Sequence, residues 1–231
     1  VKLIGLFITA LCKTKTINYD RIASAFDTKA DKNSSYRRIQ RFMRDFDFPM
    51  KVVSILIFNI LPFKENLVLV LDRTNWKFGE HNINILMLGI SYKNVAFPLM
   101  FKMLDKRGNS DTEERINLIK KYIEWFGKQS IDCLLADREF VGGKWLEFLN
   151  DEKIRYHIRI RNNFTIYSYQ KQEQIKAFWL FNNLKVSEFY HYPKIVELHG
   201  QRCYLSGTKT IDRDGKMEFL IIVSFNKPEQ A

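Results

Sequence analysis

Two aspartates stand at the ends of two separate apolar runs. Asp72 ends LVLVLD at residues 67–72, and Asp137 ends IDCLLAD at residues 131–137. Continuous apolar runs of this length are typical of central strands that are covered on both faces. Functional groups in an α/β sheet gather at the carboxyl ends of the strands, so neighbouring strands would bring these carboxylates together. The alternative is that each aspartate only caps the turn after its strand.

Two adjacent carboxylates predict a site for a hard divalent cation, because they repel each other and a bound cation removes this cost. Mg²⁺ prefers oxygen ligands, keeps several waters and accepts phosphate oxygens from a substrate. Two such ions can activate a water or a 3′-hydroxyl and stabilise the leaving oxygen. We therefore expect Asp72 and Asp137 to be metal-binding and catalytic residues for phosphoryl transfer. Mg²⁺ is the expected cofactor, and Mn²⁺ is expected to be able to replace it.

The charge of the chain indicates a polyanionic partner. Lys and Arg number 37 against 26 Asp and Glu, a formal net charge of +11. Nucleic acid is the first candidate and a membrane surface the second. Arg73 and Arg138 directly follow the two aspartates, and Arg159 and Arg161 lie on the basic face of the alternating run IRYHIRIR (154–161). We expect these four arginines to contact DNA; the alternatives are surface ion pairs for the first two and a solvated strand face for the others.

Residues 1–62 have helical apolar spacing and predict an all-α segment. In KNSSYRRIQRFMRDF (32–46), the residues Ile39, Phe42, Met43 and Phe46 share one helix face. The opposite face carries Arg37, Arg41 and Arg44, and Arg38 lies at the flank of that face. All four arginines are candidate DNA contacts. With the preceding helix INYDRIASAF (17–26), this pattern fits a helix-turn-helix on DNA phosphates. An ordinary amphipathic helix fits equally well.

The elements after residue 66 predict an α/β fold. A hairpin is expected over 83–92 and 95–104, then a helix over 110–127 with a Ser110–Glu113 capping box, and another helix over 142–151. Residues 164–225 read as short strands. Three separated cysteines and four histidines have no metal-ligand spacing. The apolar stretches at 1–13 and 52–61 are too short to span a bilayer and are expected to be core helices, so we expect a cytoplasmic protein without a membrane partner.

Three stretches in combination carry a family resemblance: LDRTNWKFG, LLADREFVGGKWLEFL and IRIRNN. Together they resemble the core of bacterial insertion-sequence transposases of the DDE type, over about residues 10 to 225. The resemblance implies a ribonuclease-H-like mixed sheet interrupted by a β-rich insertion, with Asp72 and Asp137 as the first two metal-binding acids. It implies a helical DNA-binding segment at 1–62, the first part of the catalytic core at 63–163 and the insertion at 164–231.

The same resemblance implies cleavage and strand transfer at transposable-element ends. The partners would be double-stranded DNA, as element ends and as target, and a second copy in a homodimer. The location would be the bacterial nucleoid.

The third acid of this family is missing from the chain. In the family it is a Glu in the pattern Tyr, two residues, Arg, three residues, Glu, six residues, Lys, and this pattern is absent. The last glutamates, Glu218 and Glu229, do not match it, so the third acid is assigned to no residue. We therefore expect a truncated copy that is inactive alone. The alternatives are a DNA-binding module without chemistry, acting as an inhibitor of the full transposase, and a host nuclease of the same fold.

Three further residues lie near these motifs. Glu139 is a candidate supporting acid beside the metal ligands; the alternative is that alternation along an extended segment places it nearby by accident. Trp76 follows the first aspartate and is expected to shape the site or to pack beneath it. Trp179 lies in AFWLF, whose apolar flanks predict a core residue; the family resemblance offers base stacking as the other role.

Overall fold

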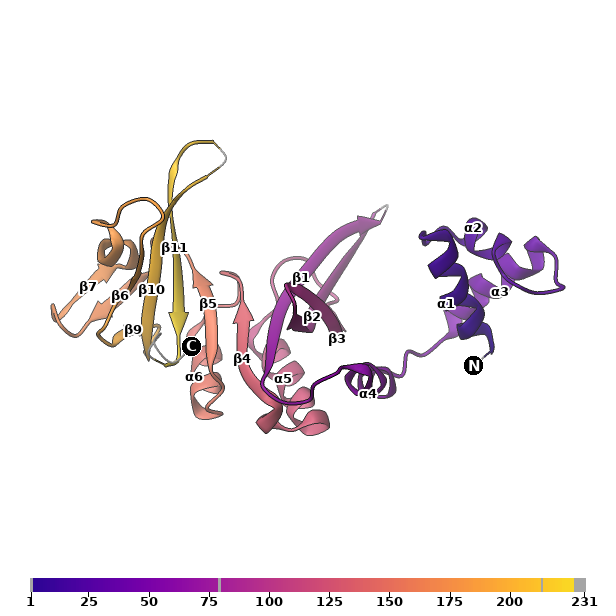
Figure 1. The fold of residues 1–231 in the computed structure, drawn as a ribbon, viewed down its shortest axis with the longest axis horizontal. Coiled ribbons are helices and arrows are strands. Elements are labelled where there is room, and N and C mark those ends of the chain that lie inside the picture. The colour runs from indigo at the N-terminus through magenta and orange to yellow at the C-terminus, as the bar shows by residue number, and fades with distance from the viewer. Residues whose placement is uncertain (1, 79, 213, 227–231) are drawn as a thin grey trace. The chain divides into compact units, whose positions relative to one another are not determined.

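The computed structural model describes residues 2–78, 80–212 and 214–226, without the side chains of Phe78 and His81 (Figure 1). The chain divides into two compact units, Val1–Pro49 and Met50–Ala231. The first is helical, and the second is a large mixed sheet with helices. Among the described residues, no helix combines the length and apolarity that a bilayer crossing requires.

The first unit consists of α1 (Lys2–Thr14), α2 (Tyr19–Ser24) and α3 (Lys32–Asp45). The side chain of Asn18 caps α2 by accepting from two backbone N–H groups, and Asp31 caps α3 by accepting from Ser34 at 3.0 Å. The core of the unit comprises Phe7, Ala10, Ile22, Ala23, Phe26 and Ile39. The helical prediction for this part of the chain is confirmed.

Helix α4 (Met50–Ile60) belongs to the second unit, so the boundary falls after Pro49 and not after residue 62. Ser54 Oγ donates to the carbonyl oxygen of Leu99 at 2.8 Å, and Phe58 stacks on Phe126 with centroids 4.5 Å apart. Val52 and Leu56 remain 66% and 58% exposed. The prediction of a core helix over 52–61 is therefore wrong in part, because α4 buries only the side that meets the sheet.

The central strands are β1 (Leu67–Phe78), β2 (His81–Tyr92), β3 (Val95–Met103), β4 (Ile131–Ala136) and β5 (Tyr156–Ile160). They lie in the order β3-β2-β1-β4-β5; the first three are antiparallel neighbours, and β4 is parallel to both β1 and β5. Lys93 and Asn94 form the predicted hairpin turn, both with positive φ. Strand β1 runs on past Asp72, where the sequence predicted its end, because its pairing with β2 continues to Phe78.

Helices α5 (Thr112–Phe126) and α6 (Gly143–Asp151), with a short 3₁₀ turn at Lys128–Ser130, pack on the sheet. The capping box of α5 is formed by Asp111 and Glu114, one residue later than predicted. The Ser110 hydroxyl instead accepts a hydrogen bond from Arg115. The buried core includes Leu69, Leu88 and Leu134.

The β-rich region after residue 164 extends the same sheet. Its strands are β6 (Thr165–Ser168), β7 (Glu173–Lys176), β8 (Phe189–His191), β9 (Val196–Leu198), β10 (Gln201–Ile211) and β11 (Met217–Ser224), with a 3₁₀ helix at Ala177–Phe181. Strand β11 pairs antiparallel with β5, so this region joins the central strands edge to edge (Figure 1). Gly200 has a φ of +80° in the β9–β10 turn, a conformation that glycine adopts without strain.

Candidate functional site

The two aspartates lie next to each other where the pairing of two parallel strands ends. The last paired residues of β1 and β4 are Leu71 and Ala136, and Asp72 and Asp137 come next. Paired strands run about 4.8 Å apart. Leu71 is buried and Asp72 is exposed, so the alternation along β1 turns the Asp72 carboxylate to the face opposite Leu71. The same alternation, continued one residue past β4, places Asp137 on that face.

Both carboxylates are available to a ligand. Asp72 accepts one hydrogen bond, from the backbone N–H of Arg73 at 2.7 Å. Within the described part of the chain, the Asp137 carboxylate has no hydrogen-bond or ion-pair partner, and its backbone carbonyl accepts from Phe140 at 2.9 Å. Both residues are exposed. Their oxygens therefore face solvent side by side.

Arg73 forms a bidentate ion pair with Glu139 on the other face of the sheet. Its Nε and Nη2 donate to the two carboxylate oxygens at 2.9 and 3.0 Å, and the side chains are only 13% and 24% exposed. Arg73 also donates to Asn84 and Asn109 at 3.3 and 3.2 Å. Arg73 follows Asp72, and Glu139 lies two residues after Asp137. The Arg73–Glu139 pair therefore ties together the two segments that carry the aspartates.

A buried layer supports this ion pair. Asn84 is 1% exposed and donates to the carbonyls of Lys106 and Gly108 at 3.0 and 2.8 Å, which holds the loop before α5 against β2. Arg115 lies 5.1 Å over the ring of Phe140. Burial lowers the pKa of the Arg115 guanidinium, and the nearby carboxylate of Glu139 opposes this shift. The segment after Asp137 is thus anchored in the core.

Arg159 is the only predicted arginine that continues the row of the aspartates among the described strands. Ile158 on β5 pairs with Ala136 on β4, so the next residues, Arg159 and Asp137, are also neighbours. Asp72, Asp137 and Arg159 therefore form one row across three adjacent strands. Its Nη2 donates to Glu218 on β11 at 3.0 Å, and its side chain is 33% exposed. Among the described residues the guanidinium bonds Glu218 through Nη2 only, so it keeps other N–H donors for a phosphate.

The other arginines near the motif differ in their surroundings. Arg138 is exposed, with no partner among the described residues. Arg161 is exposed and lines a hollow of about 580 Å³ beside β6 and the β9–β10 turn. Arg73, in contrast, has most of its donors engaged by protein acceptors. The ion pair that was the alternative prediction for Arg73 is therefore present, but it is largely buried and not on the surface.

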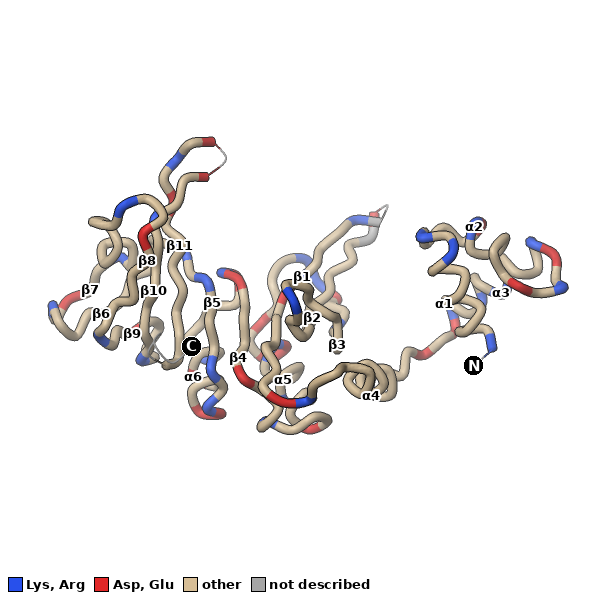
Figure 2. The backbone as a smooth tube through the Cα atoms, in the orientation of Figure 1, with Lys and Arg blue, Asp and Glu red and all other residues tan. Residues whose placement is uncertain are grey.

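The four predicted arginines of the first unit all lie on α3; Figure 2 colours Lys and Arg blue along the backbone. Arg37, Arg41 and Arg44 are exposed and line one shallow hollow, and Arg38 is half-buried at the flank. Arg44 pairs with Asp45 at 2.7 Å, which compensates part of the charge. On the apolar side, Ile39 is buried but Met43 is 53% exposed. The predicted apolar face is therefore narrower in the structure than in the sequence.

Two tryptophans are exposed. Trp179 is 57% exposed and stacks on Phe178 with centroids 5.2 Å apart, so the prediction of a core residue is wrong. Its ring adjoins a hollow that is also lined by Lys171 and Lys176. Trp76 is 51% exposed and shares the strand face of Asp72, because the two residues are four positions apart on β1. The apolar residues on either side of Trp179 pack into the core, whereas the Trp179 ring does not.

The donor set at the two aspartates fits one way in which proteins hold Mg²⁺. That cation is commonly bound by one or two carboxylates, with waters and substrate phosphate oxygens as the other ligands. Across the described residues 2–78, 80–212 and 214–226, no group of three or more His, Cys, Asp or Glu side chains could hold a metal ion. Glu218 lies on β11, paired with Arg159, and Glu229 lies outside the described residues.

Sequence reasoning missed the residues that hold the site in place. Asn84, Asn109 and Arg115 belong to none of the motifs in the sequence. Glu139 was only a candidate supporting acid, and its contact with Arg73 spans 66 positions. One signal was present: buried strands leave little room for Asn, so Asn84 within an apolar run was a candidate for a hydrogen-bonded role.

Comparison with known proteins gives a distant structural likeness. No protein-family model matches the chain, and no curated protein matches it. One solved structure that it resembles is a piggyBac transposase synaptic complex with hairpin DNA, at a TM-score of 0.47 and 14% sequence identity. The likeness covers 96% of this chain and 50% of that one, so the chain spans about half the length of that transposase.

Proposed function

We propose that this chain is a DNA transposase component of the DDE type, with a ribonuclease-H-like core around Asp72 and Asp137. The observation that carries the proposal is the placement of these two exposed carboxylates where the pairing of the neighbouring parallel strands β1 and β4 ends, at the same level and on the same face. The reaction would be cleavage and transfer of DNA strands at element ends. Double-stranded DNA would be the substrate, and a homodimer would act on paired ends.

Different residues of the chain would bind the metal ion, contact the DNA and hold the site in place. Asp72 and Asp137 would hold the cation, and Arg159 beside them would contact a phosphate of the DNA. Bound there, Mg²⁺ supplies Lewis-acid stabilisation of charge on phosphate oxygens. The Arg73–Glu139 pair would keep the aspartates adjacent. The arginine face of α3, in the first unit, would contact the DNA backbone.

The resemblance to the family implies a third acid that no residue matches, so we propose that this chain alone binds metal and DNA without cleaving. Mn²⁺ binding, followed by electron paramagnetic resonance, tests the site directly. The wild-type chain should bind Mn²⁺, and Asp72→Asn and Asp137→Asn should each weaken binding at least tenfold. Asp151→Asn, an exposed carboxylate at the end of α6, is the matched control and should bind as the wild type does.

Two outcomes would change this proposal in different ways. Equal Mn²⁺ binding by the wild type and both aspartate variants would remove the metal site. Mg²⁺-dependent nicking of DNA by the purified chain, abolished by Asp72→Asn, would keep the site and refute the inactivity of the chain alone. The DNA substrate should carry any inverted repeats that are found beside the gene.

A second candidate function is DNA binding without chemistry, as an inhibitor of a complete transposase. The exposed arginine face of α3 favours it, because that face needs no metal. It predicts DNA binding that weakens as salt rises and that is unchanged by Asp72→Asn. Replacing Arg37 and Arg41 by Gln should weaken binding, whereas binding that ignores both salt and these arginines would exclude this function.

A further inference from the structure

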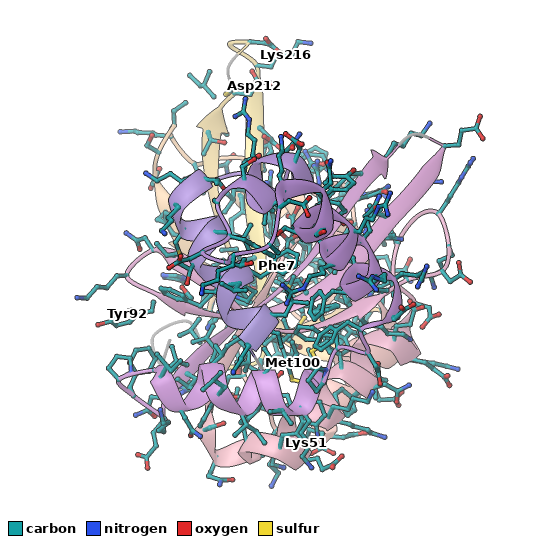
Figure 3. All side chains as sticks on the ribbon, turned by 90° about the vertical axis from the view of Figure 1, so that its right-hand side faces the viewer. Phe7, Lys51, Tyr92, Met100, Asp212 and Lys216 are labelled. Carbon is teal, nitrogen blue, oxygen red and sulfur yellow. The ribbon has the colours of Figure 1, made fainter. Side chains whose placement is uncertain are left out.

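A hollow rich in lysine lies between α4, β3 and α5 of the second unit. Its volume is about 580 Å³. Four lysines and one acid contribute charge to its lining: Lys51, Lys102, Lys120, Lys121 and Glu124. Met50, Met100, Leu118 and Trp125 supply apolar lining; Figure 3 labels Lys51 and Met100. Lysines from three separate elements thus line one concave surface, which we call the lysine groove. The Nζ of Lys120 lies 5.9 Å over the ring of Phe148 on α6.

The lysines of the groove are poorly neutralised. Lys51 lies 3.9 Å from Glu124, with side chains 58% and 67% exposed, and Lys102 lies 3.8 Å from Glu114. The long, exposed contact of Lys51 with Glu124 is weakened by water and salt. Glu114 is only 14% exposed and also pairs with Lys106 at 2.8 Å, so it offsets the charge of Lys102 only in part. Lys121 has no partner among the described residues. The groove therefore keeps an excess of positive charge that an anionic partner would offset.

The lysine groove is separate from the aspartate pair. Met100 pairs with Leu88, and Lys102 pairs with Leu86, which in turn pairs with Arg73. These residues share the face of the sheet that α5 covers, whereas Asp72 lies on the opposite face. A ligand of the groove would thus occupy the other side of the sheet from the proposed metal site.

We propose that the lysine groove binds the phosphate backbone of nucleic acid without reading its sequence. Lysine is a compact point charge on a flexible stem and lacks the planar fork with which arginine reads bases. Several lysines on one concave surface suit a chain of phosphates, because each contact releases a condensed counterion. This inference extends the proposed DNA role to a second surface, and it does not depend on the metal site.

The salt dependence of DNA binding tests the groove. The probe is a fluorescein-labelled 30-base-pair duplex of arbitrary sequence, and its affinity is measured by anisotropy over a series of salt concentrations. The variant is Lys51→Gln, Lys120→Gln and Lys121→Gln combined. Each phosphate contact contributes about 0.9 to the slope of log affinity against log salt, so the slope should fall by about 2.7 if each lysine makes one contact. Affinity at low salt should fall at least tenfold.

A charge-matched control separates the groove from net charge. It combines Lys144→Gln, Lys153→Gln and Lys185→Gln, which removes the same charge from exposed positions outside the groove. This control should leave the slope within about one unit of the wild type. An equal loss in both triple variants would overturn the proposal, because net charge alone would then explain it.

Further variants protect the test against misfolding and against another partner. Glu124→Gln removes the acid of the groove and should raise DNA affinity severalfold; unchanged or lower affinity would count against the proposal. A labelled poly-glutamate peptide is the competing probe. If the triple lysine variant of the groove no longer binds the peptide but still binds the duplex as the wild type does, the groove binds an acidic protein and the proposal fails. Asp72→Asn should leave the salt slope unchanged, so failure of the metal site is distinguishable from failure of the groove.

Discussion

The ion pair of Arg73 and Glu139 should contribute strongly to the stability of the second unit. Replacing Glu139 by Ala removes both acceptors of the bidentate contact and leaves a guanidinium that is 13% exposed without its counter-charge. Fully exposed pairs contribute about 0–1 kcal/mol, whereas breaking a buried pair costs about 3–5 kcal/mol. Asn84 and Asn109 still accept from Arg73. We therefore expect Glu139→Ala to lower the free energy of unfolding by about 2–3 kcal/mol.

Urea denaturation followed by tryptophan fluorescence measures this effect. All four tryptophans (Trp76, Trp125, Trp145 and Trp179) lie after Pro49, so their fluorescence reports the second unit alone. Glu139→Gln keeps one acceptor oxygen and should lose about half as much stability, roughly 1 kcal/mol. Glu147→Ala, at an exposed position of α6, is the control and should change stability by less than about 0.5 kcal/mol.

A double-mutant cycle with Arg73→Met completes the test. The two residues touch, so their coupling energy should be about 1–3 kcal/mol. A loss for Glu139→Ala as small as that for Glu147→Ala, or a coupling energy near zero, would refute the reasoning. The pair would then be an incidental contact that does not hold the segments of Asp72 and Asp137 together.

Three other predictions follow from whether a side chain is buried or exposed. Burial, and then the charge of Arg155, lower the pKa of His157, so the unfolded chain binds the proton more readily; stability should fall as pH drops below about 6.5, and His157→Gln should remove that part of the dependence in acid titrations. Burial raises the pKa of Cys203 to about 12 and that of Cys133 to about 11, so a thiol reagent at pH 8 should modify exposed Cys12 rapidly and the other two only on unfolding, as mass spectrometry would show. Trp179→Ala should lower the free energy of unfolding by less than about 1 kcal/mol, and a loss of 3 kcal/mol in urea denaturation would mean that the ring is buried after all.

Much of the fold could be predicted from local patterns. The apolar run before Asp72, the helix after Ser110, the alternation of residues 154–161 and the turn at Lys93–Asn94 all appear in the structure, because each depends on neighbours within one element. The predictions that failed depended on contacts between residues that are far apart in the chain. Strand β1 runs past Asp72 because β2 pairs with it, and Trp179 is exposed although its neighbours are apolar.

Local sequence patterns identify the residues that could do chemistry: Asp72 and Asp137 each end an apolar run, and arginines are close to both. Long-range packing sets β4 beside β1 in the register that makes these aspartates neighbours. It also brings Arg73 into contact with Glu139 and Arg159 into the aspartate row. The physical reason is that side-chain periodicity is a property of one strand, whereas pairing and register arise from packing between residues far apart in the chain.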